Sequence, residues 1–123
     1  MTATLRTIRL ELARDPAFPE GSAENGYEFV APIGRDGHID VETWRKERAK
    51  CKVRRFWRGS HDQHGHLIHT QGRRWTFHYD LDRAPQDDES GWKFDAHVLK
   101  PGEYVSVTEQ DGHTPTFPVA KAR

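Results

Sequence analysis

Residues 64–80 read HGHLIHTQGRRWTFHYD, and this stretch decides the fold class. Its second half alternates aromatic and polar side chains, which is the period-two pattern of a half-buried β-strand. The aromatic members are Trp75, Phe77 and Tyr79. Gln71–Gly72 marks a turn before them, so we predict an antiparallel hairpin with strands at 64–70 and 73–80.

Alternation of apolar and polar residues recurs through the rest of the chain, interrupted by proline and glycine. It predicts six further strands, at residues 8–12, 27–31, 52–58, 92–96, 103–109 and 116–120. Asp40 is placed as the N-cap of one short helix near 40–50. We therefore predict a mainly β fold, a curled antiparallel sheet or small barrel of seven to eight short strands with this one helix. The alternative is an α+β arrangement in which the helix packs on one open sheet.

Two details of this scheme depend on glycine and proline. The stretch before the second strand, as far as Asn25–Gly26, is predicted as a loop. Pro118 lacks an amide hydrogen and removes one ladder donor, so we expect residues 116–120 to form an edge strand.

The composition describes a single domain, residues 1–123, with a thin core. Lys and Arg number 19, as do Asp and Glu, so the formal net charge is zero. The lone Cys51 excludes an intramolecular disulfide and a cysteine-based zinc cluster. No run approaches the roughly 18 apolar residues of a membrane helix, and no apolar signal-peptide run is present. We expect a cytoplasmic protein with no membrane partner, and a thin core makes a homodimer one expected arrangement.

Five of the eight histidines fall in residues 61–78, and their positions raise the question of a metal site. The hairpin register decides which imidazoles share a face. With an even loop, His66 lies opposite Phe77 and His78 points away from it. With a three- or five-residue loop, His66 lies opposite His78, with His64 on the same face. The sequence leaves both registers open, and the metal candidates are His64, His66 and His78.

The stretch from Trp44 to Arg58 carries eight basic residues and one acid. Basic side chains contact phosphates or carboxylates, and aromatic rings between them stack on bases in single-strand binders. The candidate residues for an anionic partner are Arg54, Arg55 and Arg58, with Trp57 and Trp44 as stacking faces. Zero net charge argues against nucleic acid, because nucleic-acid domains are usually basic. A solvated face beside the core is the simpler interpretation of the same residues.

The sequence contains no assembled catalytic machinery. Ser60, His61 and Asp62 are consecutive, so their side chains diverge and form no triad. Cys51 has no flanking partner, and an inert, partly buried thiol is the simpler interpretation. We therefore expect a small binding or interaction module rather than an enzyme. We expect a protein partner or a second copy of the chain first, and nucleic acid second. An anionic partner, either a nucleic acid or an acidic protein surface, would be bound through residues 44–58 without a cofactor. The alternative is a metal-binding protein that holds zinc or another divalent transition metal on the hairpin 61–78.

The C-terminal half contains two further patterns, Trp75-x-Phe77-x-Tyr79-Asp80 and Pro101-Gly102-Glu103-Tyr104-Val105-Ser106-Val107. In these it resembles a family of small proteobacterial proteins to which no function is assigned. The resemblance implies a bacterial, cytoplasmic, β-rich domain. It implies no activity, cofactor or catalytic residue.

Overall fold

A computed structural model describes residues 3–69, 74–79, 92–95, 98–108 and 114–123. The described part contains eight strands and one helix that continues into a short 3-10 turn, η1. The strands are β1 Thr4–Leu12, β2 Ser22–Ile33, β3 Lys52–Phe56, β4 Gln63–His69, β5 Arg74–Tyr79, β6 Trp92–Asp95, β7 Tyr104–Ser106 and β8 Thr116–Ala122. The helix α1 covers Val41–Glu47, and η1 covers Arg48–Lys50.

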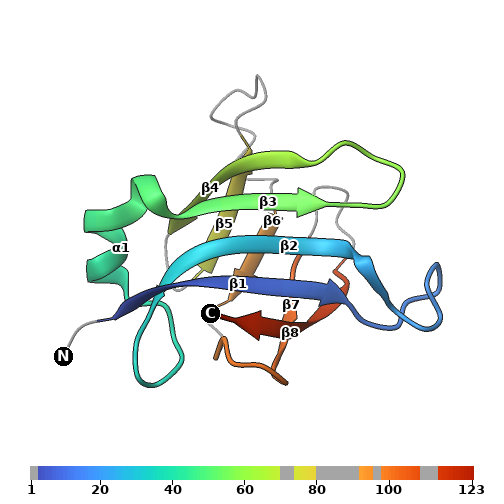
Figure 1. Ribbon diagram of the computed structural model, residues 1–123, viewed down its shortest axis with the longest axis horizontal. Helices are drawn as coiled ribbons and strands as arrows, with labels where there is room; N and C mark the ends of the chain where they lie inside the picture. The colour runs from blue at the N-terminus through green and yellow to red at the C-terminus, as the bar shows by residue number, and fades with distance from the viewer. Residues whose placement is uncertain (1–2, 70–73, 80–91, 96–97, 109–113) are drawn as a thin grey trace.

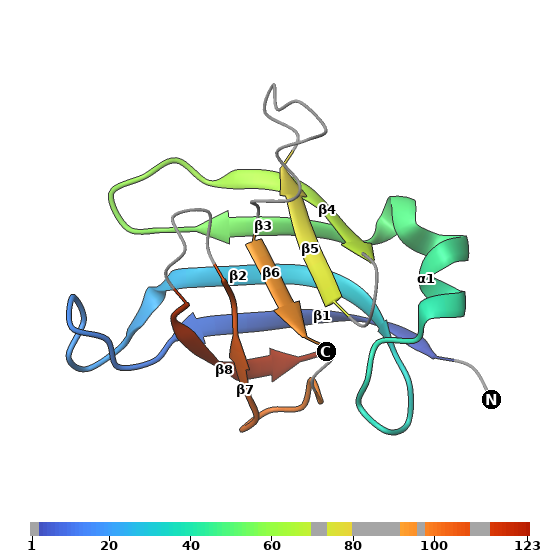
Figure 2. The same ribbon diagram turned by 180° about the vertical axis from the view of Figure 1, so that it is seen from behind.

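The strands form one antiparallel sheet in the order β6-β5-β4-β3-β2-β1-β8-β7. The sheet curls, so that β5 and β6 lie across the back of β1, β2 and β3 (Figures 1 and 2). No ladder joins the two end strands β6 and β7 within the described residues, which makes the sheet a half-barrel. The prediction of a mainly β fold with a curled antiparallel sheet is confirmed.

The core lies inside the curl, and β1 and β2 contribute every second residue along much of their length to it. In β1 these residues are Ile8, Leu10 and Leu12, and in β2 they are Tyr27, Phe29 and Ala31. Aromatic rings fill the centre, with the centroid of Phe77 5.1 Å from that of Tyr27 and 5.2 Å from that of Phe29. These are ordinary distances for paired aromatic rings. The alternation read from the sequence therefore marks the face that each strand buries.

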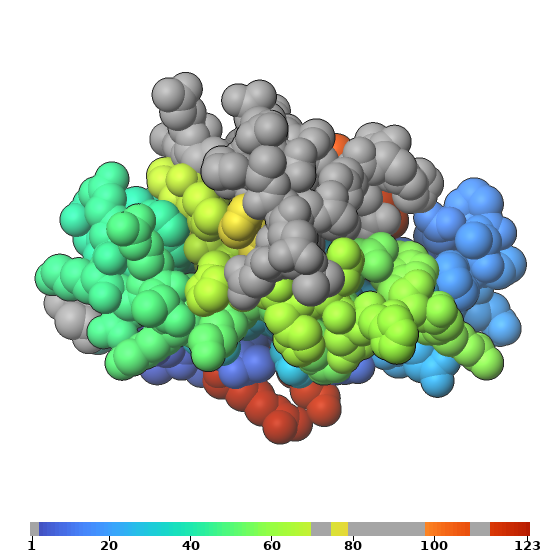
Figure 3. Space-filling view, turned by 90° about the horizontal axis from the view of Figure 1, so that it is seen from above, coloured from blue at the N-terminus to red at the C-terminus, as the bar shows by residue number. Residues whose placement is uncertain are grey.

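The helix closes one end of the curl, opposite the connection between β1 and β2 at the other end (Figure 3). Asp40 is its N-cap, as predicted, and accepts a hydrogen bond from the amide of Thr43. Hydrogen bonds from the Thr43 hydroxyl and amide hold the pKa of Asp40 below its usual value, and Lys46 lowers it further. Trp44 points inward, where its Nε1 donates to the carbonyl of Leu67 at 2.9 Å.

The hairpin of β4 and β5 adopts the register that an odd-length loop requires. His69 pairs with Trp75, so five residues separate these partners along the chain. His66 lies directly opposite His78, and Leu67 lies opposite Phe77. Leu67, Trp75 and Phe77 are all buried in the core. Burial of these three apolar side chains on one face is the physical reason for the register.

Two local expectations are wrong. Asn25 and Gly26 lie in β2, which begins at Ser22, because a bulge between Glu11 and Leu12 lets the ladder with β1 continue.

Residues 116–122 do not form an edge strand, since β8 lies between β1 and β7. The carbonyl of Thr116 accepts a hydrogen bond from the amide of Ala13, just after β1, so the backbone of Pro118 also faces the β1 side of the sheet. The proline, which has no N–H to donate, lies directly beyond the last β1–β8 pair, Leu10 with Val119.

Candidate functional site

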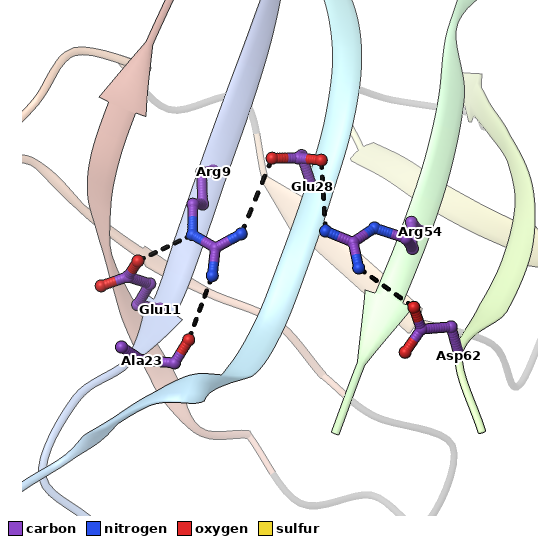
Figure 4. A network of polar contacts seen from close by, with 6 residues as sticks. All are labelled: Arg9, Glu11, Ala23, Glu28, Arg54 and Asp62. Carbon is purple, nitrogen blue, oxygen red and sulfur yellow. Dashed lines mark hydrogen bonds and ion pairs between the residues drawn. The ribbon is translucent and has the colours of Figure 1, made fainter. Parts of the chain in front are cut away.

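The outer face of the sheet, opposite the core, carries a row of charged side chains on three neighbouring strands. The registers place Arg9 of β1 opposite Glu28 of β2, and Glu28 opposite Arg54 of β3. Figure 4 shows Glu28 between the two guanidinium groups, with one carboxylate oxygen 3.7 Å from Arg9 and the other 3.3 Å from Arg54. Glu28 therefore links the cations of two strands that are not themselves neighbours.

Both arginines have a second acidic partner. Arg9 Nε donates to Glu11 at 2.7 Å, and Arg54 Nη1 donates to Asp62 at 3.0 Å. Arg9 also donates to the carbonyl of Ala23 at 3.1 Å. Burial alone lowers the pKa of Arg54, but hydrogen bonds to Asp62 and Glu28 outweigh it and raise the pKa above its ordinary value. These arginines are fixed within the network rather than free to reach a partner.

The two guanidinium groups also cover an aromatic ring on this outer face. Phe56 is only 7% exposed, although it points away from the core that Val53 enters. The guanidinium carbon of Arg9 lies 4.4 Å from the centre of its ring, and that of Arg54 lies 5.0 Å away. Phe56 pairs with Gly26, where an added Cβ would come within 1.9 Å of a carbonyl oxygen. A ring beside a glycine that must remain a glycine is a recognised way to cover the bare backbone.

A groove of about 400 Å³ opens beside this network, at the seam of β1 and β8. Its lining residues are Thr7, Arg9, Glu11, Glu28, Lys121 and Arg123. Arg9 is held by its own acids, whereas no acid among the described residues is in ion-pairing distance of Lys121 or Arg123. A double backbone hydrogen bond between Thr7 and Arg123 fixes the end of β8 against β1. The groove therefore offers two exposed cations on a rigid backbone.

The predicted stretch 44–58 does not form one surface. Trp44 is 6% exposed and packs edge-on against Trp75, so neither face of its ring is available for stacking. Arg55 shares the core-facing side with Tyr27, and its guanidinium lies 4.3 Å from the ring centre of Trp57. Arg54 points to the opposite side. Arg58 follows the strand and pairs with Glu24 at 3.3 Å.

The three candidate metal ligands lie on the outer face of the hairpin, with His66 opposite His78 and His64 two positions along β4. Within the part of the chain that the structure describes, no group of three or more His, Cys, Asp or Glu side chains could hold a metal ion. His69 lies on the other face, packed on Trp75 with ring centres 4.6 Å apart. The shared face of the three histidines is therefore not by itself a coordination site.

Cys51 is fully buried, more completely than the sequence suggests. Burial, together with the smaller effect of the negative charge of Glu47, raises the pKa of its thiol to about 11. Such a thiol is protonated at neutral pH and is a poor nucleophile.

The groove was not predicted from the sequence. Lys121 and Arg123 are far from residues 44–58 along the chain, and only the pairing of β8 with β1 brings them beside Arg9. Alternation along the strand would put Lys121 and Arg123 on the same face as the buried Phe117 and Val119. A bulge between Val119 and Lys121, where the register with β1 shifts, instead brings Lys121 opposite Arg9. This bulge is a property of the strand pairing, and alternation along the chain gave no signal for it.

The chain was compared with protein-family models, with curated proteins and with solved structures, and none of the three comparisons found a match. The resemblance to a proteobacterial family therefore stays a prediction. No helix in the described ranges is long and apolar enough to cross a membrane.

Proposed function

We propose that this chain is a small, non-catalytic binding module that takes an anionic partner on the outer face of its sheet. The observation that carries the proposal is the gathering of cations from distant parts of the chain on that face. They are the exposed Lys52 from β3, Lys121 from β8 and Arg123, which directly follows β8. Such a one-sided arrangement attracts anions even when the whole chain is neutral.

The partner that fits this face best is an acidic protein surface. Base stacking in single-strand binders needs exposed rings. Two of the rings in 44–58, Trp44 and Phe56, are covered, and Trp57 is half-buried against Phe18. Acidic side chains require only the exposed cations Lys52, Lys121 and Arg123. We also propose that the protein acts in the cytoplasm of a bacterium, where a second copy of the chain is another candidate partner.

Charge reversal on the outer face tests the proposal. The variant Lys52→Glu/Lys121→Glu changes two exposed cations that make no ion pair with any described acid. The control Arg35→Glu/Lys46→Glu makes the same change in net charge at exposed positions, in a turn and on α1. We expect poly-L-glutamate labelled for fluorescence anisotropy to bind the first variant at least about tenfold more weakly than the control.

The same experiment has outcomes that count against the proposal. An equal loss of affinity in both variants would mean that polyglutamate binding depends on the net charge of the protein and not on this face. Tighter binding of single-stranded poly(U) than of polyglutamate at equal ionic strength would assign the face to nucleic acid.

Metal binding on the hairpin is a second candidate, because His66 lies directly opposite His78. Two imidazoles supply half of a tetrahedral zinc site, so another ligand must come from elsewhere. A zinc titration followed through the imidazole resonances tests this. Saturable sub-micromolar shifts confined to His64, His66 and His78 would support it, and weak shifts spread over all eight histidines would exclude it.

A further inference from the structure

We propose that the groove between β1 and β8 is a site for a phosphate monoester, held by Lys121, Arg123 and Thr7. This inference rests on the proposed function, since it names the chemical group that the outer face recognises. The groove, about 400 Å³, is large enough for the phosphate and part of the group that carries it.

The lining of the groove is positive overall. Arg9, Lys121 and Arg123 carry three positive charges against the two negative charges of Glu11 and Glu28, and Glu28 is also shared with Arg54. Arg9 is engaged by both acids, whereas no described acid is in ion-pairing distance of Lys121 or Arg123. A phosphate monoester carries about 1.5 to 2 negative charges at neutral pH, and Lys121 and Arg123 are the cations that can attract it.

The donors in the groove also match a group with three acceptor oxygens. Lys121 provides an ammonium group, Arg123 provides a guanidinium that can bind two oxygens, and Thr7 provides a hydroxyl. Lys121 lies in β8 and Arg123 directly follows its last residue, where two backbone hydrogen bonds to Thr7 continue the pairing with β1. The backbones of Lys121 and Arg123 therefore lie about 7 Å from each other. A phosphate between their side chains can contact both.

The walls of the groove are fixed before any ligand arrives. Arg9 is held by contacts to Glu11, Ala23 and Glu28, and Thr7 is held by two backbone bonds of 2.7 and 3.0 Å to Arg123. Pre-organised groups lose little entropy on binding, so the cost of ordering falls mainly on the side chains of Lys121 and Arg123.

The test is a titration of ¹⁵N-labelled protein with O-phosphoserine, followed by amide NMR, with serine as the counterpart that lacks only the phosphate group. We expect saturable shifts at Thr7–Glu11 and Val119–Arg123 with O-phosphoserine and none with serine. The variant Lys121→Ala/Arg123→Ala should weaken binding at least about tenfold, whereas Arg35→Ala/Lys46→Ala should leave it unchanged. Thr7→Val, which keeps the shape and removes the hydroxyl, should weaken binding several-fold.

Shifts that are scattered over exposed arginines and lysines, or that survive in Lys121→Ala/Arg123→Ala, would overturn the phosphate site. If polyglutamate still bound the outer face in that case, the proposed function would stand without it. If neither probe bound, both proposals would fall. A short peptide with a central phosphoserine distinguishes the source of the group. Binding at least about tenfold tighter than that of free O-phosphoserine would support a phosphate carried by a protein, and equal binding would support one carried by a small molecule.

Discussion

Two phenylalanines on opposite faces of the sheet are almost equally buried, but by different kinds of neighbour. Phe77 is 1% exposed and lies among the aromatic rings of the core. Phe56 is 7% exposed and lies beneath the guanidinium groups of Arg9 and Arg54. The difference shows that the arginines on this outer face cover apolar surface as well as carry charge. Basic residues in a sequence are therefore not all available to a partner.

The largest effect should come from the core. Phe77→Ala removes a ring that contacts Tyr27 and Phe29 and leaves a cavity that rigid strands cannot close. We expect the free energy of unfolding to fall by about 3–5 kcal/mol, measured by denaturation in urea. A loss below 1 kcal/mol would show that the interior of the curl repacks freely.

Phe56, on the outer face, should contribute less to the free energy of unfolding than Phe77. Phe56→Ala removes two cation–π contacts and some buried area, but the flexible stems of Arg9 and Arg54 can move into the space. We expect a loss of about 2 kcal/mol in the same assay. Phe56→Leu is the matched control, because it keeps much of the area and removes only the π-face. A loss as large as that of Phe77→Ala would remove the distinction between the two faces.

Added salt should reduce the contribution of the charged outer face to stability, but not that of the core. Glu28→Gln keeps the shape of the side chain and removes the charge that links Arg9 to Arg54. These groups are about one-third exposed or less, so we expect a loss of at most about 1 kcal/mol at low salt, and less at 1 M NaCl. Glu24→Gln, whose partner Arg58 is well exposed, should have almost no effect. The loss in Phe77→Ala should not decrease with salt, and a similar decrease there would contradict this division.

The smallest effect concerns the helix cap. Because hydrogen bonds lower the pKa of Asp40 in the folded state, its charge stabilises the fold above the usual value of 3.8. That contribution disappears as the pH falls through the lower folded-state pKa. Asp40→Asn can still cap the helix but does not titrate. We expect a stability difference of some tenths of a kcal/mol between the two proteins at pH 6 that closes by about pH 2. A gap that is independent of pH would assign the difference to shape alone.

The sequence predicted what depends on local pattern. Alternation located all eight strands, and Asp40 with Trp44 placed the helix near its observed bounds. The extension of β2 back to Ser22 was missed because it depends on a bulge in β1, a feature of the pairing and not of either segment.

Most of the candidate site depends on which strands become neighbours. Arg9, Glu28 and Arg54 are widely separated in the chain, and only two successive registers align them. The hairpin histidines show the same limit, because the sequence permits two registers and burial of Leu67 beside Phe77 is a tertiary effect. The uneven distribution of basic residues along the chain, by contrast, was visible in the sequence. Which of these residues share a face of the sheet could be known only from the strand order.

The position of β8 between β1 and β7 also has a consequence for how the chain folds. β1 to β6 pair in chain order, so each can join as soon as its neighbour has formed, whereas the β1–β8 seam joins residues about a hundred positions apart. Closing so long a loop is slow compared with forming a hairpin. We expect the meander to assemble first on a ribosome-bound chain and the last hairpin to dock afterwards. The groove is lined by residues from both sides of this seam, so a ligand there would bind chains in which β8 has paired with β1 and not chains in which it has not.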